Sequence, residues 1–104
     1  MSRWPDPGTK LERALICSAA DAGVVLTVIA ATATPWASVT FAGARHQLTV
    51  VAARSSSLDA WLAGLSEAEF CLGGHLLADL AVTGTIDAVG LMEVTLEALT
   101  VEDC

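Results

Sequence analysis

Residues 71–80, with the sequence CLGGHLLADL, bring together side chains that could do chemistry: a thiol at Cys71, an imidazole at His75 and a carboxylate at Asp79. In a helix, His75 and Asp79 would be neighbours at positions i and i+4 and a plausible pair. The two glycines before His75 and the alternating pattern after it instead favour a strand, in which the two side chains share a face about 13 Å apart. We therefore expect no His–Asp dyad, and we expect Cys71 to be a small buried packing residue.

Arg45 and His46 are a second place where chemistry is conceivable, because a cation beside an imidazole can bind an anion. The strand pattern described below places both residues in a solvent-exposed loop, where a polar turn without a ligand is the more common arrangement. The candidate ligand-binding residues are therefore Arg45, His46, His75 and Asp79, and the sequence does not specify a ligand for them.

Metal, cofactor and nucleophilic chemistry find little support in the sequence. The chain has no Cys-x-x-Cys or His-x-x-x-His spacing, so a zinc site would need Cys17, Cys71, His46 and His75 to converge in the tertiary structure. The glycine-containing segments lack the spacing and the following helix of a phosphate-binding loop. We predict no metal site, no cofactor and no catalytic residue.

Any site must be positioned by helices and strands, and the first helix is predicted at residues 10–22. Thr9 and Glu12 have the spacing of a capping box, and Gly23 follows at a position where glycine often ends a helix. Residues 1–8 are rich in proline and glycine, and we expect them to form a flexible leader.

A second helix is predicted after Ser57, which is suited to cap its amino terminus. Its apolar residues recur at i, i+3, i+4 and i+7, which is typical of a helix that packs on one side: Leu58, Trp61, Leu62 and Leu65. Both helices therefore present one apolar stripe, and a sheet is the expected partner.

Three strands are predicted between the helices. Residues 24–34 are rich in β-branched side chains, and Pro35 is expected to end this strand. The next two strands form a hairpin in which Phe41 opposes Leu48, and this register leaves residues 43–46 as its loop.

The last third of the chain predicts a second hairpin. Its loop is residues 88–90, with the final glycine in a left-handed conformation. In this register Leu80 faces Ala98, and the same register continued outward places His75 opposite Asp103.

These elements predict a single α+β domain over residues 1–104, in the order α-β-β-β-α-β-β. An antiparallel sheet of about five strands carries two helices on one face. Hydrophobic residues make up 54% of the chain and charged residues 16%, against roughly 45–50% and 25% in an average globular domain. A domain this small and this apolar is expected to leave apolar surface exposed.

Charge is distributed unevenly along the chain. Residues 1–54 hold all five lysines and arginines with three acidic residues, whereas residues 55–104 hold nine acidic residues and no lysine or arginine. Such an acidic field repels phosphate backbones, so we expect no nucleic-acid partner. The longest apolar run is too short to span a membrane and no signal-peptide pattern is present, so we expect a cytoplasmic protein. Its 19 alanines and four arginines are typical of a GC-rich bacterial genome.

The favoured hypothesis is a small non-catalytic protein that acts through protein–protein contact, most simply as a homodimer. Six branched residues do not fit a one-sided pattern: Val25, Ile29, Val51, Leu77, Leu99 and Val101. Several of them are expected on the sheet face opposite the helices, where a second copy would cover them. One alternative is a small apolar ligand held between helices and sheet. Another is an enzyme that uses His46 or His75 with a carboxylate such as Asp79 or Asp103, although two histidines, one lysine and no tyrosine leave few groups for catalysis.

Overall fold

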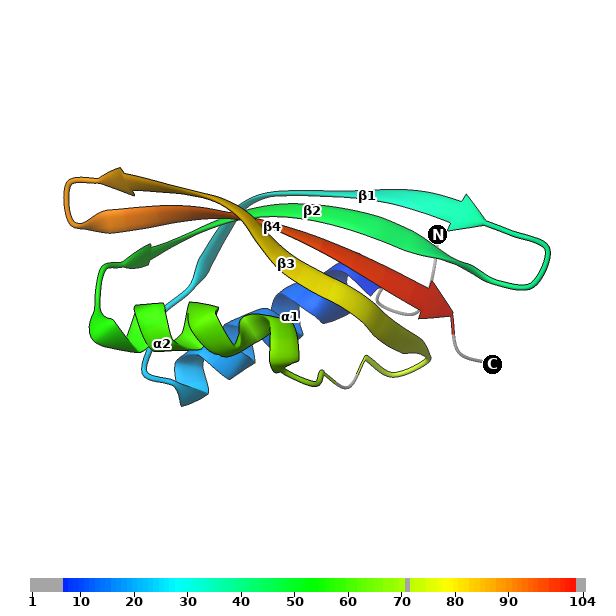
Figure 1. Ribbon diagram of the computed structural model, residues 1–104, viewed down its shortest axis with the longest axis horizontal. Helices are drawn as coiled ribbons and strands as arrows, with labels where there is room; N and C mark the ends of the chain where they lie inside the picture. Colours follow the sequence, from blue (N-terminus) through cyan, green and yellow to red (C-terminus); the bar gives the residue numbers. More distant parts are fainter. Residues whose placement is uncertain (1–6, 71, 103–104) are drawn as a thin grey trace.

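A computed structural model describes residues 7–70 and 72–102, so that Cys71, Asp103 and Cys104 lie outside the described residues. It is an α+β fold in which an antiparallel sheet of four strands, ordered β1-β2-β4-β3, lies over two helices (Figure 1). The elements are α1 Pro7–Asp21, β1 Thr27–Ala37, β2 Ala42–Ala53, α2 Ser56–Gly64, the short 3-10 helix η1 Leu65–Glu67, β3 His75–Ala88 and β4 Leu91–Glu102. Across residues 7–70 and 72–102, no helix combines the length and the apolar character needed to cross a membrane.

The chain order α-β-β occurs twice, and the sheet reflects this repetition. The second strand of each half, β2 and β4, lies inside the sheet, and the first strand of each half, β1 and β3, lies at an edge. Because β2 and β4 are antiparallel, an approximate two-fold axis normal to the sheet relates the two hairpins. Figure 1 shows both helices on one side of the sheet and the two hairpins extending in opposite directions.

The core lies between the helices and the inner strands. The two apolar stripes predicted from the sequence are confirmed, because Leu11 and Leu15 of α1 and Leu58 and Trp61 of α2 are buried. They pack on residues of β2 and β4 that alternate with outward-facing ones: Leu48, Val50, Val94 and Leu96. Each such leucine removed from water contributes about 1.5–3 kcal/mol. The indole nitrogen of Trp61 also donates to Ser18 Oγ at 3.0 Å, which joins the two helices.

The expected five strands are four, because β1 continues through Pro35 to Ala37. The prediction that Pro35 ends a strand is therefore wrong. Strand β1 is an edge strand, and an edge strand accepts proline because the missing N–H need not belong to a ladder hydrogen bond. As a consequence the loop of the first hairpin is residues 38–41, not 43–46, and β2 begins at Ala42.

The helix boundaries differ from the expected ones by a few residues. Helix α1 begins at Pro7 rather than at residue 10, and proline is well accepted in a first turn, where its N–H is not needed. Gly23 follows the helix with φ +84°, as its predicted role requires. Helix α2 is capped by Ser55 rather than Ser57, since Ser55 Oγ accepts a hydrogen bond from the N–H of Leu58 at 3.0 Å.

The second hairpin follows its predicted register at the centre. Leu80 pairs with Ala98 as expected, and Gly90 has the expected left-handed conformation with φ +80°. The turn contains two residues, Val89 and Gly90, rather than three. The difference arises from a β-bulge in β3, which adds a residue to one strand and moves the pairing by one position near the turn.

Gly43 marks a close approach of the two inner strands. It pairs with Val101, and a Cβ atom at Gly43 would overlap the carbonyl oxygen of Thr100 and lie 3.0 Å from the Cα of Val101. Both neighbours are backbone atoms of β4, which cannot move aside without disturbing the ladder. Glycine is therefore required here by contact between strands.

We expect Gly43→Ala to lower the free energy of unfolding by about 1–3 kcal/mol, the usual cost of adding a methylene where there is no space. Gly84→Ala is the matched control, because Gly84 is also a strand glycine and a Cβ there meets nothing within 4 Å. The control should leave stability unchanged or raise it slightly. Urea denaturation measures both, and equal stabilities for the two variants would contradict the close approach.

Candidate functional site

Arg45 and His46 lie in the middle of β2, not in a loop. The prediction of a solvent-exposed loop at these residues is wrong, because it depended on the strand ending at Pro35. Successive side chains of a strand point to opposite faces, so His46 faces the helices and is 3% exposed, whereas Arg45 is exposed on the other face. The two side chains therefore cannot hold one anion between them.

His46 forms a buried polar cluster across the two inner strands. Its Nε2 lies 2.8 Å from Oγ1 of Thr100, and that hydroxyl donates to the carbonyl oxygen of Ala44 at 3.4 Å. Which of the two atoms donates in the contact between Nε2 and Oγ1 follows from the imidazole tautomer, and in either case the contact satisfies the buried ring nitrogen. Thr100 is fully buried and was not among the sequence candidates. The sequence feature that could have identified Thr100 is its position, because every second residue of β4 from Val94 to Thr100 is buried and the others in that series are apolar.

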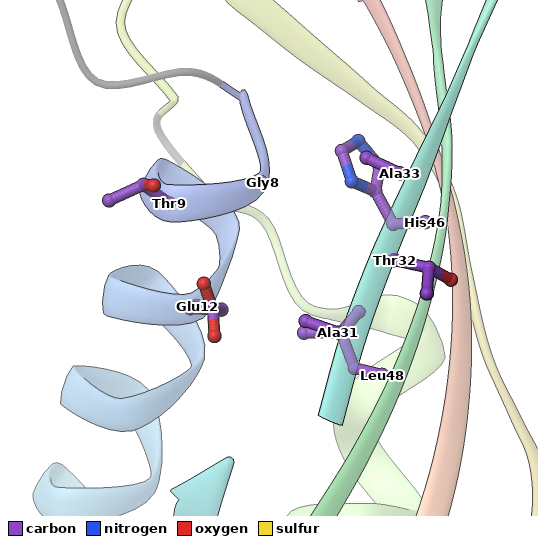
Figure 2. Close-up of a pocket in the computed structure, with 8 residues that line it drawn as sticks. All are labelled: Gly8, Thr9, Glu12, Ala31, Thr32, Ala33, His46 and Leu48. Carbon is purple, nitrogen blue, oxygen red and sulfur yellow. The ribbon is translucent and has the colours of Figure 1, made fainter. Parts of the chain in front are cut away.

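A hollow lies beside His46, between the first turns of α1 and the strands β1 and β2 (Figure 2). Its volume is about 240 Å³, and its described lining consists of Gly8, Thr9, Glu12, Ala31, Thr32, Ala33, His46 and Leu48. Figure 2 shows the imidazole of His46 projecting from β2 toward α1, while the side chain of Thr32 points away from the helix. The glycine and the two alanines leave this space open because they have small side chains or none.

A second hollow adjoins the first, since Gly8 and Ala33 line both. It has a volume of about 270 Å³ and reaches His75 and Glu102, with further lining from Pro7, Pro35, Gly43 and Ala44. Within the part of the chain that the structure describes, Nδ1 of His75 is buried and has no hydrogen-bond partner.

His75 and Asp79 lie on opposite faces of β3. His75 pairs with Glu102 rather than with Asp103, and Asp79 pairs with Leu99. The expectation that they share a face is wrong, because a β-bulge between Leu77 and Asp79 reverses the alternation. On opposite faces the imidazole and the carboxylate cannot form a dyad, whereas a regular strand would at least have placed them on the same face.

Asp79 shares the open face of the sheet with Arg45. Both residues pair with Leu99 of β4, from opposite sides, so two strand spacings of about 5 Å separate their backbones. The four candidate residues therefore do not form one site. Among residues 7–70 and 72–102, no group of three or more histidine, cysteine, aspartate and glutamate side chains is placed to hold a metal ion.

Comparison with known proteins assigns neither a family nor a function to this chain. No protein-family model, no curated protein and no solved structure matches this chain. Its function is therefore argued from its own surfaces and contacts.

The sheet face opposite the helices is polar at its centre. Glu93, Glu97 and Asp79 lie on it, as the alternation of the second hairpin predicts, together with Arg45. Several of the six branched residues were expected on this face, and three of them lie there, half-buried: Val51, Leu99 and Val101. Leu77 instead packs against the core, so that part of the prediction is wrong. Val25 precedes β1 and Ile29 lies at the bulge of this strand, and both side chains are exposed.

We expect the thermal midpoint to rise modestly with salt, because screening reduces repulsion among the carboxylates of this face and within a chain of net charge −7. The exposed ion pair between Arg54 and Asp87, at 3.2 Å, opposes this trend only weakly. Scanning calorimetry between low salt and about 0.5 M sodium chloride, where the Debye length is a few ångströms, tests this. A falling midpoint would show that attractive pairs dominate.

We expect Thr100→Val to lower the free energy of unfolding by about 1–3 kcal/mol, because it removes a hydroxyl that satisfies the buried Nε2 of His46. Thr95→Val is the matched control on the same strand, since Thr95 is half-buried and faces away from the helices. The control should change stability by less than about 0.5 kcal/mol. Equal effects in urea denaturation would mean that the buried cluster contributes nothing.

Proposed function

We propose that this protein is a non-catalytic α+β module that acts through protein–protein contact, and that its first partner is a second copy of itself. The observation that carries this proposal is the number of large apolar side chains left exposed on a small domain. Within the described chain they are Ile16, Val25, Ile29, Val39, Phe41, Leu76, Val82, Ile86, Val89 and Leu91. Their burial against another protein removes apolar area from water, which is the main favourable term in association.

The distribution of charge supports a second copy as the partner. The net charge of −7 makes two copies repel each other over most of their surfaces. Residues 22–44 contain no charged side chain at all, and they include the whole of β1. Two like-charged molecules can approach along this segment with the least electrostatic cost.

The open face of the sheet is the less suitable surface for this contact. It carries the carboxylates of Asp79, Glu93 and Glu97 and one cation, Arg45. Packing two such faces together would desolvate several like charges, which costs several kcal/mol per ion when they are not paired. The proposal therefore rests on the neutral side of the molecule.

Light scattering after gel filtration at low micromolar concentration should give twice the chain mass of 10.7 kDa. The dimer should persist in about 0.5 M sodium chloride, because a contact without charges is not weakened by screening. A mass of 10.7 kDa at both salt concentrations would contradict self-association.

A further inference from the structure

The two edges of the sheet are protected to different extents. An edge strand exposes unpaired N–H and C=O groups, and proteins limit this with bulges and charged side chains. Strand β3 has both, with two bulges and the carboxylates of Asp79 and Asp87. Strand β1 has a bulge near its start, and at its other end Pro35 has no N–H to offer at the outer edge. Between these two features, residues 30–34 pair regularly with β2 and carry no charge, so this part of the outer edge resembles an unfinished sheet.

We infer that β1 pairs with β1 of a second copy in antiparallel orientation, which joins the two sheets into one of eight strands. This inference rests on the proposed self-association and specifies its surface. A two-fold axis at Thr32, the midpoint of β1, places Ala30 opposite Thr34 and Ala31 opposite Ala33 of the other copy. The regular pairing between the two copies covers residues 30–34, because Pro35 has no N–H to donate to Ile29 of the other copy.

The residues that flank β1 are complementary about the same axis. Val25 and Val39 each lie seven positions from Thr32, and they are 86% and 106% exposed. Antiparallel pairing brings the end of β1 that Val25 precedes in one copy toward the end that Val39 follows in the other, and it does so twice. Ile29, which is also exposed, falls opposite Pro35 of the other copy in this register. The backbone contact at the centre is thus accompanied by apolar contacts at both ends.

The helices are placed so that this contact can extend beyond the strands. A two-fold axis normal to the sheet keeps the helices of both copies on the same face of the joined sheet. Helix α1 is the helix that contacts β1, so the two copies of α1 lie on either side of the axis. Exposed Ile16 on α1 adds an apolar side chain near the start of β1, where it lines a hollow with Val24 and Val25.

Charge reversal at Thr32 tests the pairing. Thr32 is exposed, so Thr32→Lys and Thr32→Glu should each fold with a circular dichroism spectrum close to that of the unaltered protein. Each variant places two like charges about 5 Å apart across the axis, and each should lose the dimer at concentrations where the unaltered protein is dimeric. An equimolar mixture of the two variants should recover a dimer of one chain of each kind.

Gln47→Glu is the matched control, because Gln47 pairs with Thr32 and is exposed on the same face, one strand further from the edge. A carboxylate at this position lies beside Glu97 and adds to the negative charge of the open face. Edge pairing leaves this variant dimeric, whereas a dimer formed by the open sheet faces would dissociate. A monomeric unaltered protein would contradict the proposed function itself. A dimer that survives both Thr32 variants, or variants whose mixture stays monomeric, would overturn the edge pairing and leave self-association standing.

Discussion

The pairing of the two inner strands is the constraint on which the rest of the structure depends. Eleven residue pairs join β2 to β4, from Gly43–Val101 to Ala53–Leu91. A slip of one residue would turn every core side chain of a strand to the open face. Two features that no helix supplies hold this register: the close approach at Gly43 and the buried hydrogen bonds of His46 with Thr100. The helices then pack on the apolar face that the register creates.

The same constraint explains why the groups capable of chemistry do not form a common site. His46 is used within the sheet, its neighbour Arg45 points to the opposite face, and a bulge separates His75 from Asp79. The pairing also decides which strands remain at the edges. Bulges and carboxylates occur on β3, whereas β1 has neither charge nor irregularity over most of its length. The distinctive feature of the molecule is therefore a surface and not a cluster of reactive groups. The uncharged outer edge of β1 contrasts with the acidic surface elsewhere.

Much of the local structure was predictable because it depends on neighbours in the sequence. The spacing of Leu58, Trp61 and Leu65 identifies a helix whatever it packs on, and Gly90 adopts its left-handed conformation because the turn requires it. Alternation in the second hairpin correctly paired Leu80 with Ala98. The candidate site was predicted less well, since the strand pattern can place Thr100 among buried residues but does not identify His46 as its partner.

The sequence by itself determined the fold class, the apolar stripes, the acidic carboxyl-terminal half and a charge-free segment around β1. Only the tertiary structure decided that Pro35 lies within a strand, because proline is accepted or rejected according to whether its nitrogen faces a neighbour or an open edge. That single difference moved His46 from an expected loop to the core. A strand's local preferences are set by adjacent residues, but its position in the sheet is set by residues far away in the chain, and the burial of each side chain follows from that position.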